Sequence, residues 1–116
     1  MIFGCTKPPN TQNLIPIKPS GLRAYGLSTT KVKLIWSDNS TNEAGYKIER
    51  KTATSSFVIV GTVGQNIIQY IDSNLSQNTT YTYRVFSFYR TGVISTYSNE
   101  VTIYTGSSNL PSPTDV

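Results

Sequence analysis

The sequence predicts an all-β fold in which two sheets pack face to face as a sandwich. Two observations carry this prediction. Apolar side chains alternate with polar ones in short runs, which is the period of strands that bury one face. Clusters of Gly, Asn, Asp and Ser separate these runs, and no helical period is found in them. A chain of seven such strands without a helix is expected to fold as two packed sheets.

The first three strands follow Pro19, and each has one apolar face. The side chains expected to be buried are Leu22 and Ala24 in the first strand, Val32, Leu34 and Trp36 in the second, and Tyr46 and Ile48 in the third. Trp36 is the only Trp of the chain. We expect it to pack between the sheets, because a buried Trp needs a large partner surface.

Four more strands complete the set. A short run covers residues 57–63. The other three strands are expected to bury Ile68 and Tyr70, then Tyr81, Tyr83, Val85 and Ser87, then Val101 and Ile103. The large side chains of the third and sixth strands are the expected partners of Trp36.

The 116 residues suffice for a single domain. Residues 1–16 are rich in Pro and polar side chains and are interpreted as an extended N-terminal arm. Residues 106–116 are interpreted as a polar C-terminal tail or linker. The domain itself is expected to cover residues 17–105.

Several segments resemble a known family. Residues 19–22 (Pro-Ser-Gly-Leu), 32–36 (Val-Lys-Leu-Ile-Trp) and 45–50 (Gly-Tyr-Lys-Ile-Glu-Arg) are similar to strands A, B and C of a fibronectin type III domain. Leu75, residues 81–85 and residues 97–101 are similar to its E–F corner, strand F and strand G. The resemblance covers about residues 16–105 and is strongest to microbial members of the family.

This resemblance implies an immunoglobulin-like sandwich of seven strands, with A, B and E facing C, C′, F and G. It makes Trp36, Leu75 and Tyr81 structural core residues. Tyr81 fits a tyrosine corner, whose hydroxyl group hydrogen-bonds backbone a few residues upstream, near Leu75. Tyr83 is expected to contribute less to stability than Tyr81 if its own hydroxyl group reaches solvent.

The composition argues against an enzyme. The chain has no His and one Cys, which excludes His-based catalytic triads and any metal site built from several Cys. The carboxylates that could do acid–base chemistry are expected to be solvated charges on separate strands and loops: Asp38, Glu43, Glu49, Asp72 and Glu100. We therefore expect no cofactor, no metal and no catalytic residues. No motif supports a carbohydrate ligand.

Two sequence motifs match known functional motifs only in part. The loop before the last strand contains Arg90 and Gly92 but lacks the Asp of an integrin-binding Arg-Gly-Asp sequence. Residues 2–5 (Ile-Phe-Gly-Cys) resemble a bacterial lipobox, whose Cys carries lipid, without the hydrophobic segment that precedes one. Cys5 is thus either a lipidation site of a truncated lipoprotein or an incidental free thiol. No transmembrane segment is expected.

The charge is unevenly distributed. The formal net charge is +4, and residues 1–37 contain five cations and no carboxylate. The cations are Lys7, Lys18, Arg23, Lys31 and Lys33. They are expected either to face an acidic partner or to protect an edge strand from pairing with another chain. Nucleic-acid binding is not expected, because the sequence has no dense Lys/Arg run and no known binding motif.

Large apolar side chains also occupy the phases expected to face outward. In one sheet these are Phe86 and Phe88, flanked by Arg84 and Tyr104, and in the other they are Ile35, Ile67 and Ile71. Contiguous exposed apolar residues usually mark an interface. We expect protein contacts through these faces and the terminal arms, centred on Phe86 and Phe88. The alternative is that other parts of the same chain cover them.

The sequence therefore favours a non-catalytic structural and interaction module. The first hypothesis is a building block of a surface or virion-type assembly that binds a protein partner or itself. The alternative is a spacer or accessory module of a secreted microbial surface protein or polysaccharide-degrading enzyme. The low charged fraction, 14%, and the many hydroxyl groups favour an extracellular or particle-surface location.

Overall fold

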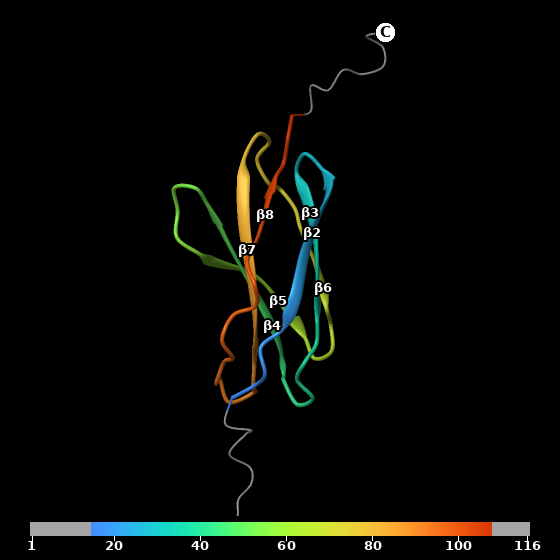
Figure 1. The fold of residues 1–116 in the computed structure, drawn as a ribbon, viewed down its shortest axis with the longest axis vertical. Helices are drawn as coiled ribbons and strands as arrows, with labels where there is room; N and C mark the ends of the chain where they lie inside the picture. Colours follow the sequence, from blue (N-terminus) through green and yellow to red (C-terminus); the bar gives the residue numbers. More distant parts are fainter. Residues whose placement is uncertain (1–14, 108–116) are drawn as a thin grey trace, which may run out of the picture.

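A computed structural model describes residues 15–107, and seven strands lie within them (Figure 1). The strands are β2 (Ser20–Ser28), β3 (Lys31–Ser37), β4 (Gly45–Thr52), β5 (Val58–Gly64), β6 (Gln69–Asp72), β7 (Thr80–Phe88) and β8 (Val101–Tyr104). Cys5 and nearly all of the two expected arms lie outside the described residues, so their roles and boundaries stay predictions.

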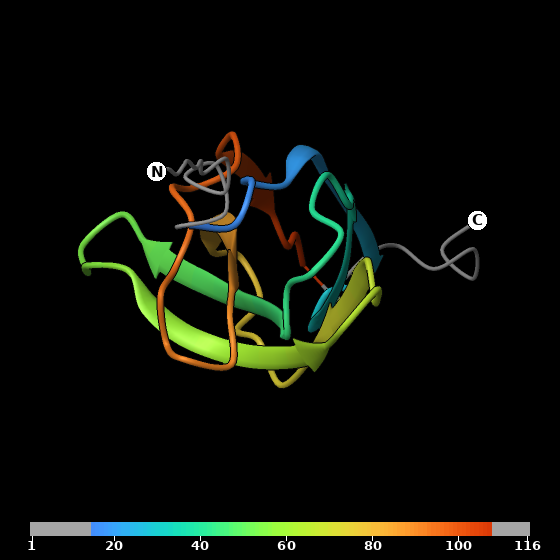
Figure 2. The ribbon, with the colours of Figure 1, turned by 90° about the horizontal axis from the view of Figure 1, so that it is seen from below.

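The strands form two antiparallel sheets that pack against each other (Figure 2). One sheet has the order β2-β3-β6 and the other the order β5-β4-β7-β8. This arrangement confirms the predicted sandwich, in which A, B and E face C, C′, F and G.

The alternation of side chains explains how the sheets bury a common core. Val32, Leu34 and Trp36 of β3 are at most 2% exposed and face Tyr46 and Ile48 of β4, both at 0%. The Trp36 and Tyr46 rings meet edge to face, with their centroids 5.6 Å apart. Trp36 is thus placed between the sheets as its strand phase predicted.

The connection from β6 to β7 contains the expected tyrosine corner. Leu75 is buried, and the Ser76 N–H group donates a hydrogen bond of 2.9 Å to the Tyr81 hydroxyl oxygen. In this hydrogen bond, the backbone N–H group is the donor and the Tyr81 hydroxyl oxygen is the acceptor. Tyr81 therefore anchors the turn that carries the chain from one sheet to the other.

A buried carboxylate joins the two sheets beside this corner. Asp72 of β6 is 4% exposed, and its Oδ2 atom accepts hydrogen bonds from Arg50 Nη1 at 2.8 Å and from the Tyr83 hydroxyl group at 2.7 Å. Burial and the bond to Asp72 raise the pKa of Tyr83 above its ordinary range. Burial alone would lower the pKa of Arg50, but the hydrogen bond to Asp72 and the charges of Asp72 and nearby tyrosines together outweigh this and raise the pKa.

These contacts correct three expectations. Asp72 and Glu43 are 4% and 1% exposed, so they are not solvated charges. Tyr83 is fully buried, so its hydroxyl group does not reach solvent. The sequence did contain a signal, because Asp72 shares the inward phase of Tyr70, and Arg50 shares that of Ile48. Opposite charges on two inward faces indicate a pair across the core.

Glu43 has a different structural role. Its Oε2 atom accepts a hydrogen bond of 3.0 Å from the N–H group of Asn66, a residue with a positive φ of 64°. The carboxylate therefore stabilises the turn between β5 and β6. Nearby, the Tyr46 hydroxyl group donates to Asp38 Oδ1, and burial together with this bond raises the pKa of Tyr46.

Replacing Asp72 tests the contribution of the buried carboxylate. Asp72→Ala should lower the free energy of unfolding by about 3 kcal/mol, because it leaves Arg50 and the Tyr83 hydroxyl group without their partner. This is the low end of the usual range, since 27% of the Arg50 side chain is exposed. Urea unfolding measures the loss. The control Glu100→Ala removes an exposed carboxylate and should change stability by less than about 0.5 kcal/mol. Similar losses in both variants would contradict the assignment.

Candidate interaction surfaces

The outer face of the four-stranded sheet is organised around Arg84. Its Nε atom donates to Glu49 Oε1 at 2.7 Å, and its guanidinium group stacks on two rings. The guanidinium carbon lies 3.8 Å from the ring centroid of Phe57 and 3.5 Å from that of Tyr97. Arg84 is therefore held in place by contacts within its own domain.

The prediction that Phe86 is the exposed centre of a contact site is wrong. Phe86 does point to the outer face, opposite Lys47 and outside the core cluster. It is only 4% exposed, however, because the Tyr97 ring meets it edge to face at a centroid distance of 5.6 Å. The covering side chain comes from the segment between β7 and β8, so the alternative of self-coverage is correct for Phe86.

Two serines hold this covering segment against β7. Ser95 and Ser98 donate their N–H groups to the carbonyl oxygens of Ser87 and Val85 at 2.9 and 2.8 Å. Their hydroxyl oxygens accept the N–H groups of the same two residues, each at 3.0 Å. Tyr97 lies between the two serines and is thereby fixed over Phe86. The Ser-Thr-Tyr-Ser sequence was the signal that strand periodicity alone overlooked.

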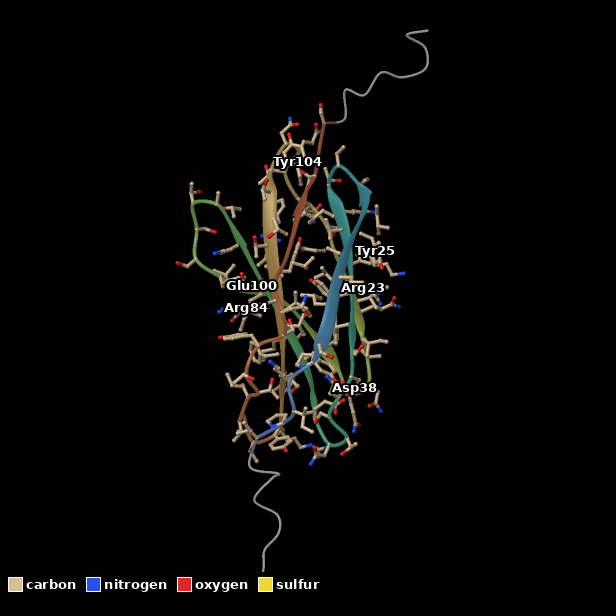
Figure 3. The ribbon with its side chains drawn as sticks, in the orientation of Figure 1. Arg23, Tyr25, Asp38, Arg84, Glu100 and Tyr104 are labelled. Carbon is tan, nitrogen blue, oxygen red and sulfur yellow. The ribbon has the colours of Figure 1, made fainter. Side chains whose placement is uncertain are left out.

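The other two residues of the predicted patch differ in their distance from Phe86: Phe88 follows it in the same outward phase of β7, whereas Tyr104 lies far away. Phe88 is half-buried, and the Lys47 ammonium group lies 4.8 Å from its ring centroid. Tyr104 is 60% exposed, pairs with Thr80 and donates a hydrogen bond to Asn78. Thr80 and Phe86 are six residues apart on β7, about 20 Å. Figure 3 likewise shows Tyr104 far along the sheet from Arg84.

The outer face of the three-stranded sheet is different because much of its apolar surface stays exposed. Strand register places Arg23 opposite Ile35, and Tyr25 and Ile71 on either side of Lys33. Tyr25 is 46% and Ile71 50% exposed, whereas Ile35 is half-buried. Figure 3 shows Arg23 and Tyr25 in succession along β2. The expected outward positions of Ile35 and Ile71 thus meet on one surface.

We call this surface the basic face. It consists of Arg23 and Tyr25 of β2, Lys31, Lys33 and Ile35 of β3, and Ile71 of β6. Ile67, also predicted as a contact residue, is 45% exposed and lies just before β6. Strands β2 and β3 contain no carboxylate, and the one in β6, Asp72, points into the core. The basic face therefore combines cations and exposed apolar groups without an opposite charge.

At one edge of each sheet, side chains form hydrogen bonds with backbone N–H or C=O groups. At β2, the Asn99 amide accepts the Leu22 N–H group at 2.9 Å and donates to the Leu22 carbonyl oxygen at 3.1 Å. At β5, the Tyr70 hydroxyl group donates to the Val60 carbonyl oxygen at 2.8 Å, where β5 also has an irregular register. Both devices oppose the pairing of another strand at these edges.

A surface hollow of about 440 Å³ is lined by Thr41, Asn42, Glu43, Ala44, Gln65 and Arg90. Its buried carboxylate, Glu43, already holds the β5–β6 turn. Residues 15–107 contain no group of three or more His, Cys, Asp or Glu placed to hold a metal. The same part of the chain has no helix with the length and hydropathy of a membrane span.

Solved structures with the same architecture identify the fold. The chain matches domains A168–A170 of titin with a TM-score of 0.69 and 24% identity, over 80% of this chain and 33% of that fragment. It matches the fn3 domain of human contactin 1 with a TM-score of 0.71 and 18% identity, over 82% of both chains. A Fn3-like protein from Clostridium thermocellum matches with a TM-score of 0.62 and 24% identity, over 75% and 90%.

The chain therefore has the fibronectin type III fold, and it spans about a third of the titin fragment. No protein-family model matches the sequence. No curated protein matches it either.

Removing the cover of Phe86 tests the structure of the four-stranded face. Tyr97→Ala should lower the free energy of unfolding by about 1–3 kcal/mol, because it removes an aromatic pair and a cation–π contact. Tyr104→Ala is the matched control, since Tyr104 is 60% exposed and should matter by less than about 0.5 kcal/mol. Equal losses in chemical denaturation would show that Tyr97 does not cover Phe86.

Proposed function

We propose that this chain is a non-catalytic structural and protein-interaction module, a building block of an extracellular-surface or virion-type assembly. The observation that carries the proposal is the basic face. Tyr25 and Ile71 are about half exposed on either side of Lys33 in strand register, whereas the opposite outer face covers its large aromatic residue Phe86. Exposed apolar groups of this kind are typical of interfaces.

The exposed apolar groups of the basic face would supply part of the binding free energy of a contact. Covering the remaining exposed surface of Tyr25 and Ile71 would contribute about 1 kcal/mol for each side chain, because full burial of such a group is worth about 2–3 kcal/mol. Ile67 and Leu27, 45% and 50% exposed, extend the apolar surface available near β2 and β6. Arginine and tyrosine are among the residue types that are enriched in strongly contributing interface residues.

A non-catalytic role is supported by the use of the carboxylates. Asp72 joins the two sheets, Glu43 holds a turn, and Glu49 pairs with Arg84. Acid–base catalysis requires carboxylates that converge on a substrate and are available for proton transfer. Asp72, Glu43 and Glu49 instead make structural hydrogen bonds.

A spacer module is the second candidate, and one comparison favours it. The titin match covers one third of a fragment of several domains, so the same fold occurs there as one unit of a series. By analogy, this chain would be a spacer or accessory module of a secreted microbial surface protein or polysaccharide-degrading enzyme. A spacer needs no specific contact through the basic face, which separates the two candidates.

The experiment replaces the apolar part of the basic face in the source organism. Tyr25→Ser with Ile71→Ser should leave the purified domain folded, because neither side chain belongs to the core cluster. The variant should nevertheless be lost from the purified surface fraction or particle, since the contact area is removed. The control is Tyr104→Ser with Val58→Ser, which changes an aromatic and an aliphatic residue that are 60% and 56% exposed elsewhere.

Quantitative mass spectrometry of the assembled fraction gives the result. Loss of the basic-face variant, with normal recovery of the control, supports the building-block function. Normal recovery of both variants contradicts it and favours the spacer. Circular dichroism of both purified variants establishes that each is folded.

A further inference from the structure

We propose that the basic face binds an acidic surface of a different protein, with carboxylates placed around an apolar or aromatic centre. This inference rests on the proposed function and names the chemistry of its partner. It follows from the distribution of charge over the fold, from the strand on which the cations lie, and from the use of the chain's own carboxylates.

The charges of the basic face are arranged around its apolar groups. Lys33 lies between Tyr25 and Ile71 in strand register, and Arg23 lies opposite Ile35. Lys31 extends the positive charge toward the β2–β3 turn. Because no carboxylate accompanies these three cations on the sheet face, their potentials add. A partner with carboxylates at matching positions would be guided and oriented by this field.

The position of Lys33 argues against protection of an edge strand. Strand β3 is the centre of its sheet and is paired on both sides, with β2 and β6. A lysine on a central strand cannot block the pairing of a further strand. At the β2 edge, the Asn99 amide already occupies both backbone groups of Leu22. The cations of β3 are therefore available for a ligand on the face of the sheet.

A second copy of the chain does not fit this surface. Two basic faces in contact would place like charges together, which opposes association. A copy could instead offer an acidic patch, but the carboxylates of the described residues do not form one. Asp38, Glu43, Glu49 and Asp72 each accept a hydrogen bond within the domain. Glu100 is exposed, but a single carboxylate cannot match three cations.

The apolar groups favour a protein over a nucleic acid, an acidic polysaccharide or a membrane. Three cations neutralise few phosphates, and only one aromatic ring, Tyr25, is available for stacking on a base. A sulfated sugar offers no apolar group that could pack against Ile35 and Ile71. A sheet face with two partly exposed aliphatic side chains also inserts little into a lipid bilayer. An acidic protein surface satisfies both the cations and the aliphatic groups.

The test titrates the isotope-labelled full chain with a random copolymer of glutamate and tyrosine, followed by NMR. Polyglutamate, heparin, duplex DNA and phosphatidylserine vesicles are titrated in parallel. The copolymer should shift the backbone amide signals of residues 23–25, 31–35 and 69–71 and bind more tightly than the other four probes. Its affinity should fall when salt is raised, because the contact is partly electrostatic.

Matched charge reversals give the decisive comparison. Arg23→Glu with Lys33→Glu should raise the Kd for the copolymer at least about tenfold. Lys47→Glu with Arg90→Glu makes the same change in net charge on the other sheet and its loop, and should leave the Kd within about twofold. Ile71→Ser should weaken binding of the copolymer and leave binding of polyglutamate unchanged, since only the former offers aromatic groups.

Several outcomes would overturn the inference. These are no binding of the copolymer, shifts confined to other residues, equal effects of the two charge-reversal pairs, or tighter binding of another probe at this face. Failure of this inference can be distinguished from failure of the proposed function. If the serine variants are lost from the assembly but Arg23→Glu with Lys33→Glu is incorporated normally, the building-block function stands and the acidic partner is wrong.

Discussion

The structure depends on the phase of strand β3. Val32, Leu34 and Trp36 fill the space between the sheets, and Lys31, Lys33 and Ile35 must then point outward. A shift of one residue would exchange the two sets and bury two lysines, which costs far more than any gain in pairing. The central strand of the smaller sheet therefore has only one acceptable register. That register places Lys33 toward the middle of an exposed face and Lys31 at its end, near the β2–β3 turn.

The two outer faces of the sandwich differ in how far side chains of the same chain cover them and pair their charges. On the four-stranded face, the chain covers the central residues itself, because Tyr97 covers Phe86 and Arg84 is held by Glu49 and two rings. The exposed apolar side chains of this sheet, Val58, Ile59 and Tyr104, lie on its edge strands β5 and β8. On the three-stranded face, the cations have no carboxylate beside them, and Tyr25 and Ile71 keep about half of their surface exposed. We therefore expect a ligand to bind the three-stranded face.

Strand periodicity was enough to predict the sheets and most of the core. The inward positions of Trp36, Tyr46 and Val85 follow from alternation alone. Ile68 was expected to be buried with Tyr70 but is 39% exposed, and it lies in the irregular segment just before β6. Phe86 was placed on the correct side but expected to be exposed. Its cover depends on how the segment before β8 returns along β7, and alternation within one strand cannot reveal that path.

The candidate site was predicted only in pieces. Alternation placed Ile35 and Ile71 on the outer face of one sheet, and composition identified a basic first third of the chain, but neither indicated that Tyr25 and the cations lie beside these two residues. That follows from the pairing of β3 with β2 and β6, which sets Lys33 between Tyr25 and Ile71. The buried Asp72 was missed for a related reason, because its pairing with Arg50 and Tyr83 exists only across the two sheets.

Lysine reactivity in the natural assembly tests the central claim most directly, because the two outer faces each provide lysines. Lys31 and Lys33 belong to the basic face, and Lys47 and Lys51 lie on β4 of the other sheet. Acetylation followed by mass spectrometry compares each lysine in the assembly with the same lysine in the free domain. The account predicts that Lys31 and Lys33 lose reactivity while Lys47 and Lys51 keep theirs. Protection of Lys47 and Lys51 with Lys31 and Lys33 unchanged would contradict it.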